Sequence, residues 1–173
     1  VYSKYSSGQN FIFNSFKNTK ALFNVQKKNI DENQVFFIGG KLSERGAFTL
    51  ENELKLLKEI YIYFHNKGLN ITYISKRSTS DFKLIQIDKL GYSIARLDYP
   101  LELFLIKEHI IPNCVCGLGS SLFATLPLIL PQINYRYIKI NRSLFNDQKD
   151  VDIYNKFLEF ALKSSSLQPI YIN

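Results

Sequence analysis

From residue 35 onward, short apolar runs alternate with longer stretches in which apolar residues recur at helical spacing. The apolar runs fall at residues 35–38, 70–74, 92–97, 114–116 and 135–140. Short, continuously apolar runs are typical of buried parallel strands, and parallel strands need helical connections between them. The pattern therefore predicts an α/β fold, Rossmann-like, with an open and mostly parallel sheet and helices on both faces.

Residue types at the ends of the apolar runs indicate where the helices begin. Thr49 and Ser80 are predicted N-caps, because a side-chain oxygen at this position can accept a hydrogen bond from the first helical turn. Pro100 fits the first position of another helix, since proline lacks the backbone N–H that would be unpaired there. A last amphipathic helix is predicted over residues 151–162.

The first part of the chain differs in composition from the rest. Residues 1–34 are polar and rich in Asn and Lys, which predicts a connecting segment, or the remnant of a preceding region, with one or two short elements. Residues 35–173 are predicted to form one domain, and a chain that is 46% hydrophobic can bury a full core. The sequence contains no methionine, so we expect it to be processed or excised from something longer.

The chain is basic, but its positive residues are scattered. There are 22 Lys and Arg residues against 15 Asp and Glu, which gives a net charge of +7, and the only clusters are Lys27–Lys28 and Lys76–Arg77. This distribution suits a small anionic ligand or a membrane surface with anionic lipid. No nucleic-acid partner is expected, because Arg and aromatic residues are not interleaved in a stripe. A nucleic-acid-binding domain remains an alternative that the net charge alone supports.

The residues that commonly bind metals do not form a recognisable cluster. The histidines are His65 and His109, the cysteines are Cys114 and Cys116, and no CxxC pattern is present. We therefore expect no metal ion and no disulfide framework. Because no stretch reaches the length of a membrane span and no signal peptide is recognisable, we expect a cytoplasmic protein.

Polar and small residues follow each predicted strand, where ligands bind in open parallel sheets. A glycine turn before a helix brings backbone N–H groups to an anion, and serines at the helix start add hydroxyl donors. Neighbouring cations would hold a phosphate, and a carboxylate can accept both hydroxyls of a ribose. The set predicts a nucleotide site, and its members are Gly39, Gly40, Ser43, Glu44, Ser75, Lys76, Arg77, Asp98, Glu102, Gly117, Ser120 and Ser121.

Each of these residues also has an ordinary structural interpretation. Ser120 and Ser121 could serve only as helix N-caps. Lys76 and Arg77 could belong to a solvated loop. Glu102 lies in the first turn of a predicted helix, where a carboxylate complements the helix dipole.

The order of four segments resembles that of the bacterial lipooligosaccharide sialyltransferases and the related capsular polysialyltransferases. The resemblance covers residues 35 to about 140 and implies the C-terminal, donor-binding lobe of a two-lobed, B-type glycosyltransferase. A separate acceptor lobe would need roughly another hundred residues. The matching segments are residues 37–46 (FIGGKLSERG), 73–77 (YISKR), 98–102 (DYPLE) and 117–122 (GLGSSL).

The resemblance implies a donor and its binding residues. An inverting, metal-independent sialyltransferase of this kind uses CMP-sialic acid to build a bacterial surface glycan, either lipooligosaccharide or capsule. The resemblance places Glu102 on the ribose and Ser120 and Ser121 on the phosphate. The other residues implied in the nucleotide site are Gly39, Gly40, Arg77 and Gly117.

Two residues are implied as catalytic. Lys76 stands where the family carries a histidine, and as a fixed charge it would neutralise the departing phosphate. Glu44 is the remaining carboxylate of an acidic motif in which Arg45 replaces its neighbour, and it would act as the base for the acceptor hydroxyl.

Further partners follow from the resemblance, and so do alternatives. The partners would be a nucleotide-sugar donor, a glycan acceptor, the cytoplasmic face of the inner membrane through peripheral contact, and a second copy in a homodimer. The replacements at Lys76 and Arg45 favour a first alternative, a catalytically impaired nucleotide-binding relative or assembly subunit. A second alternative is a transferase for another nucleotide sugar.

Overall fold

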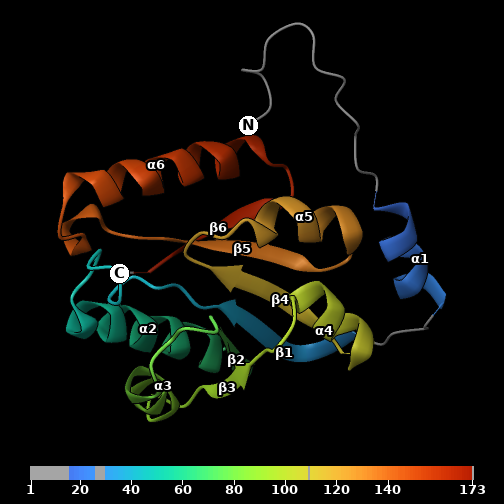
Figure 1. Cartoon of the computed structure of the whole chain (residues 1–173), viewed down its shortest axis with the longest axis horizontal. Coiled ribbons are helices and arrows are strands. Elements are labelled where there is room, and N and C mark those ends of the chain that lie inside the picture. Colours follow the sequence, from blue (N-terminus) through green and yellow to red (C-terminus); the bar gives the residue numbers. More distant parts are fainter. Residues whose placement is uncertain (1–15, 26–29, 109, 173) are drawn as a thin grey trace, which may run out of the picture.

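A computed structural model describes residues 16–25, 30–108 and 110–172, and these form one layered α/β unit (Figure 1). All strands of the described residues run parallel in a single sheet of order β3-β2-β1-β4-β5-β6. The strands are β1 (Ile30–Ile38), β2 (Asn70–Ser75), β3 (Ser93–Arg96), β4 (Ile111–Gly117), β5 (Asn134–Lys139) and β6 (Leu167–Tyr171). The helices are α1 (Lys17–Val25), α2 (Leu50–His65), α3 (Asp81–Asp88), α4 (Leu101–Lys107), α5 (Leu122–Ile129) and α6 (Gln148–Lys163), with the short 3-10 helix η1 (Arg142–Leu144) before α6.

The end of β1 shows why the apolar runs form a central sheet. Val35 and Phe37 point into one hydrophobic cluster, and Phe36 and Ile38 point into another on the opposite face. All four side chains are buried, since helices cover both faces. The predicted Rossmann-like α/β fold is confirmed.

The helices that follow β1 and β2 pack on one face of the sheet, and those that follow β3 and β4 pack on the other. The helices α2 and α3 pack on the face that carries Phe37, whereas α4 and α5 pack on the face that carries Phe36. Figure 1 shows α2 and α3 on one side of the sheet and α5 and α6 on the other. The chain therefore leaves β1 and β4 toward opposite faces, which opens a crevice between these neighbouring strands.

The predicted N-caps are confirmed. The hydroxyl of Thr49 accepts a hydrogen bond from the backbone N–H of Asn52 at 3.1 Å, and α2 begins at the next residue. The hydroxyl of Ser80 accepts one from the N–H of Lys83 at 3.3 Å in the same way before α3. Pro100 differs from its prediction by one residue, since it precedes the first helical position of α4.

The sheet contains more than the sequence predicted, chiefly in β1 and β6. The strand β1 begins at Ile30, so residues 30–34 lengthen the central strand instead of belonging to the connecting segment; most of their side chains are exposed, and they form no apolar run. The strand β6 was not predicted. It contains Pro169, which is tolerated because β6 is an edge strand.

The two cysteines are buried in β4. Cys114 and Cys116 are two residues apart in a strand, so both side chains lie in the same hydrophobic cluster, and both are free thiols. None of the helices in the described ranges is both long and apolar enough to cross a membrane.

Candidate functional site

Two hollows open at the carboxyl edge of the sheet, and they meet at the turn after β4. Both are lined by Ile38, Ser120 and Ser121. We call the smaller one, of about 240 Å³, the basic hollow; its polar side chains are Ser75, Lys76, Arg77, Tyr99, Glu102, Ser120 and Ser121. We call the larger one, of about 700 Å³, the apolar cavity; its charged and aromatic side chains are Arg45, Phe145, Tyr154, Lys156, Phe157 and Phe160.

The basic hollow brings together six residues of the predicted nucleotide site, and one of them, Ser75, already donates its hydroxyl to the carbonyl of Ala95 at 3.2 Å. The other five have these positions. Lys76 and Arg77 follow β2, Glu102 lies in the first turn of α4, and Ser120 and Ser121 form the turn between β4 and α5. These segments are neighbours because β2 and β4 flank the same central strand, β1. Two cations, one carboxylate and two hydroxyls thus surround a space at the crevice of the sheet.

The side chains of the basic hollow differ in the hydrogen bonds and ion pairs that they form with the rest of the protein. The guanidinium of Arg77 donates a hydrogen bond to the carbonyl of Asp98 at 2.9 Å. One carboxylate oxygen of Glu102 accepts a hydrogen bond from Thr125 at 3.2 Å. Within the described ranges, the ammonium of Lys76 has neither a hydrogen bond nor an ion pair, so its charge is available to a ligand.

The turn after β4 combines a cap with free donors. The hydroxyl of Ser120 accepts a hydrogen bond from the N–H of Leu122 at 3.3 Å, whereas the hydroxyl of Ser121 makes no capping bond. The N–H groups of both serines lack an acceptor among the described residues. Gly119 has a φ of 140°, a conformation that favours glycine. The capping interpretation thus holds for Ser120 and leaves Ser121 unexplained.

Gly117 and Gly39 serve packing. A Cβ atom on Gly117 would lie 3.1 Å from the carbonyl oxygen of Ile38, because the two residues pair in the sheet. A Cβ atom on Gly39 would lie 2.5 Å from the hydroxyl of Tyr73. Burial raises the pKa of that Tyr73 hydroxyl well above its ordinary value, so the group beneath Gly39 stays neutral. Neither glycine lines a hollow, whereas Gly40 lines the apolar cavity.

Glu44 lies at the exposed edge of an ion-pair cluster whose other members, Lys83 and Glu53, are buried, and it lines neither hollow. Its carboxylate is 2.8 Å from the ammonium of Lys83, which also lies 2.6 Å from Glu53 and donates to the carbonyl of Gly40 at 3.2 Å. The second carboxylate oxygen of Glu53 accepts the N–H of Ser43 at 2.9 Å. The cluster therefore holds the loop after β1 against α2 and α3. A base at Glu44 would first have to be released by Lys83.

Lys83 and Glu53 hold the loop beside the apolar cavity, and the sequence reasoning missed them although a signal was present. Lys83 shares the buried side of α3 with Leu84 and Ile87, and Glu53 shares that of α2 with Leu57 and Ile60. A charged residue in an apolar helical stripe usually has a buried partner. The identity of that partner depends on the packing of two separate helices.

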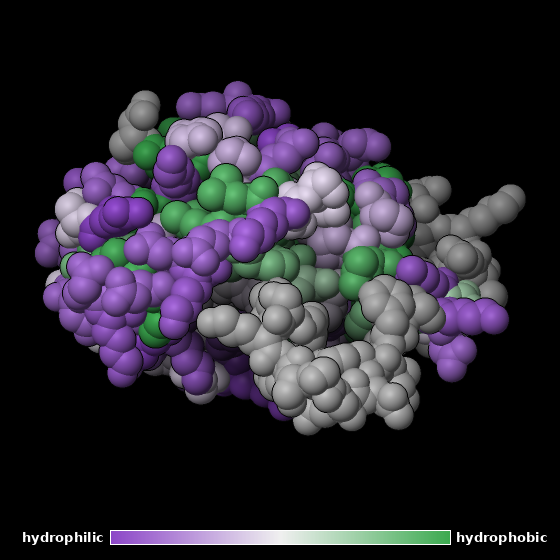
Figure 2. Space-filling view, turned by 90° about the horizontal axis from the view of Figure 1, so that it is seen from above, coloured by the Kyte–Doolittle hydropathy of each residue, from purple (hydrophilic) through white to green (hydrophobic). Residues whose placement is uncertain are grey.

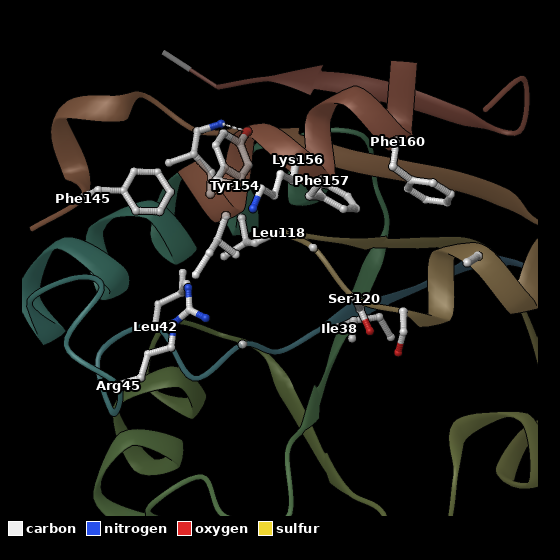
Figure 3. A pocket seen from close by; sticks show the side chains of 16 residues that line it. Ile38, Leu42, Arg45, Leu118, Ser120, Phe145, Tyr154, Lys156, Phe157 and Phe160 are labelled. Carbon is white, nitrogen blue, oxygen red and sulfur yellow. Dashed lines mark hydrogen bonds between the residues drawn. The ribbon is translucent and has the colours of Figure 1, made fainter. Parts of the chain in front are cut away.

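Aromatic rings and two cations line the apolar cavity (Figure 3). The hydroxyl of Tyr154 donates to the carbonyl of Ile138 at 3.2 Å and accepts the N–H of Ile140 at 2.7 Å, so only its ring faces the cavity. The side chains of Arg45 and Lys156 point into the open space. The cavity was not predicted, because it needs α6 packed over the ends of β1, β4 and β5.

One of these cations is paired and the other is not. The guanidinium of Arg45 lies 2.8 Å from the carboxylate of Asp150. For Lys156, the described part of the chain provides no ion pair and no hydrogen bond. Figure 2, which views the molecule from the α6 side, shows hydrophobic residues in a band between hydrophilic ones on this face.

Metal-ligating residues do not gather in the described part of the chain. Groups of three or more His, Cys, Asp or Glu side chains that could hold a metal ion are absent there. His65 ends α2 and stacks on Tyr61 with ring centroids 5.2 Å apart. His109 lies outside the described residues.

Comparison with known proteins gives a weak structural likeness. No family model matches the chain, and no curated protein matches it. It is similar to a crystal structure of glucose dehydrogenase from Haloferax mediterranei, with 14% identity, a TM-score of 0.44, and coverage of 92% of this chain and 41% of that chain. The same enzyme in complex with NADP, Zn and gluconolactone gives 12% identity, a TM-score of 0.40, and coverage of 92% and 41%. The chain thus spans about two fifths of the length of these structures, and a likeness this distant carries no functional argument.

Proposed function

We propose that this chain is the donor-binding lobe of a sialyltransferase-like glycosyltransferase and binds CMP-sialic acid in the basic hollow. The observation that carries the proposal is the meeting of Lys76, Arg77, Glu102, Ser120 and Ser121 in one hollow, at the crevice where open parallel sheets bind ligands. These residues come from three segments of the chain that also carry the resemblance to this family.

The chemistry of the hollow matches a nucleoside monophosphate. The free ammonium of Lys76, the hydroxyl of Ser121 and the open N–H groups of the turn are donors suited to a phosphate. Among the described residues, one oxygen of the Glu102 carboxylate has no hydrogen-bond partner, which suits the hydroxyls of a ribose. The hollow therefore offers a positive side and an acceptor side, as a nucleotide requires.

In the proposed reaction, the acceptor oxygen bonds to the anomeric carbon of sialic acid as the bond to the phosphate breaks, and CMP leaves with the electron pair. Lys76 would offset the negative charge that develops on the leaving phosphate. A base must take the proton of the acceptor hydroxyl. Glu44 stays a predicted base, but Lys83 holds its carboxylate away from both hollows.

The position of Glu44 favours a second candidate function: a lobe that binds the nucleotide but does not transfer the sugar by itself. An acceptor lobe would then supply the base. In either case we propose action at the cytoplasmic face of the inner membrane, where a nucleotide-sugar donor and a glycan acceptor would meet.

Calorimetric titration with CMP tests the binding site. Replacing both Ser120 and Ser121 with Ala removes hydrogen bonds to a charged group, each worth about 1.5 kcal/mol or more, so affinity should fall at least tenfold. The matched control replaces the exposed pair Ser165 and Ser166 with Ala and should leave the affinity unchanged. Unchanged affinity for CMP in the Ser120 and Ser121 variant would refute this placement. If the parent bound UMP or GDP as tightly as CMP, the cytidine assignment would be refuted.

Release of CMP from CMP-sialic acid separates the two candidate functions. Transfer to a galactose-terminated acceptor by the purified chain, lost in Glu44→Gln, would support the transferase with Glu44 as its base. CMP binding without transfer would support the binding lobe. Transfer that survives in Glu44→Gln would assign the base to another carboxylate.

A further inference from the structure

The apolar cavity lies beside the proposed nucleotide site and is a separate space that could hold a ligand. It meets the basic hollow only at Ile38, Ser120 and Ser121, and it extends from there beneath α6. Its volume of about 700 Å³ lies in the range of pockets that enclose small molecules. We propose that it binds an amphiphilic anion, a molecule with a hydrocarbon body and a terminal phosphate or carboxylate.

The walls of the cavity select an apolar body. Phe145, Phe157, Phe160 and the ring of Tyr154 form one side, and Leu42 and Ile38 lie across the open space from them (Figure 3). The hydroxyl of Tyr154 is used by the backbone around the end of β5, and the described lining contains no carboxylate or amide side chain. Its remaining hydroxyls, on Ser120 and Ser121, lie where the cavity meets the basic hollow. A free sugar needs acceptors as well as donors for its hydroxyls, so these walls suit a hydrocarbon chain better than a glycan.

The charges at the cavity select an anion. Arg45 contributes one positive charge, which Asp150 offsets at 2.8 Å. Lys156 contributes a second positive charge that no described carboxylate offsets within ion-pair distance. The cavity therefore carries one uncompensated cation among apolar walls, and a bound anionic head would compensate it while its body covers the rings.

The position of Lys156 makes the proposal testable without disturbing the fold. Its side chain is on the exposed side of α6, yet the ammonium points into the cavity. Ala124, on α5, lines the same cavity and is also exposed, so a large side chain there would fill the space from outside. Neither residue lines the basic hollow, so this site stands or fails independently of the proposed function.

The experiment is calorimetric titration of the whole chain with decyl phosphate and decanoate, each below its micelle concentration and without nucleotide. Decanol and decyltrimethylammonium serve as the neutral and cationic counterparts. We expect both anions to bind, the alcohol to bind at least tenfold more weakly, and the cation not to bind. A preference for the phosphate over the carboxylate, or the reverse, identifies the head group.

Variants assign the binding to this cavity. Lys156→Gln should weaken decyl phosphate binding about tenfold and leave decanol unchanged, because it removes the charge and keeps an unbranched polar side chain of similar size. The matched control, Lys163→Gln on the exposed surface of the same helix, should bind as the parent does. Ala124→Trp should abolish binding of every probe, with circular dichroism showing an intact fold.

Three results would overturn the proposal. They are equal affinity of the parent for decyl phosphate and decanol, equal affinity of the parent and Lys156→Gln for decyl phosphate, and undiminished binding by Ala124→Trp. CMP affinity, measured on the same variants, should match that of the parent. A failure of CMP to bind would count against the proposed function but would not bear on ligand binding in the apolar cavity.

Discussion

The ammonium of Lys83 lies 2.6 Å from a carboxylate oxygen of Glu53, and both residues are 1% exposed. The pair joins α3 to α2 underneath the loop that follows β1. Its remaining hydrogen-bonding capacity is used by that loop, since Lys83 also reaches Gly40 and Glu44, and Glu53 accepts the N–H of Ser43. A buried pair of this kind fixes the loop that borders the apolar cavity.

Lys83→Met should destabilise the fold by about 3 to 5 kcal/mol, because it leaves the carboxylate of Glu53 buried without its cation. Chemical denaturation measures this difference. The exposed ion pair between Arg96 and Asp81, at 2.7 Å, provides the contrast: Asp81→Asn should cost about 1 kcal/mol or less. A similar cost for both variants would show that Glu53 finds another partner or gains a proton.

Gly39→Ala should destabilise the fold by about 1 to 3 kcal/mol, since the added Cβ would meet the ring of Tyr73 at 2.5 Å and the buried ring has little room to move. Gly40→Ala is the matched control one residue later, where the nearest side-chain atom, on Leu42, is 3.5 Å away. Thermal unfolding of the two variants checks the difference. Equal melting temperatures would show that Tyr73 can give way.

The sequence predicted the parts of this structure that depend on local patterns. Thr49 and Ser80 were recognisable as caps because an N-cap acts within one helical turn. The residues of the basic hollow were recognisable because the ends of parallel strands share one edge of the sheet, whatever the details of packing.

The parts that were missed depend on distant segments or on position in the sheet. Ile30 and Asp31 pair with β4 and Gln34 pairs with β2, although residues 30–34 form no apolar run. Backbone pairing and not burial therefore makes this stretch part of β1. Residues 167–171 were not predicted as a strand; Pro169 lies there on β6, where an edge needs no further N–H donor. The partner of Lys83 and the apolar cavity follow only from how the helices pack.

Lys76→Ala should weaken CMP binding and make the remaining affinity less dependent on salt, because a free ammonium beside a phosphate acts through its charge. The measurement is the affinity for CMP across a series of salt concentrations. The control is Lys89→Ala, a lysine that is exposed at the end of α3 and lines neither hollow. Parallel salt dependence in the parent and Lys76→Ala would exclude Lys76 from the phosphate site.

Glu102→Ala should abolish the preference for CMP over deoxy-CMP, which separates the two interpretations of this carboxylate. If Glu102 binds both ribose hydroxyls, losing one of them removes a charge-assisted hydrogen bond, so the parent should prefer CMP by about tenfold and the variant should bind both nucleotides equally. If Glu102 only complements the dipole of α4, the variant should lose about 0.3 to 1 kcal/mol of stability and keep the parent's ratio of affinities. Thr125→Val offers a milder change, since it removes the hydrogen bond of 3.2 Å that orients the carboxylate and keeps the carboxylate itself. A ratio that Glu102→Ala leaves intact would remove the ribose from this side of the basic hollow.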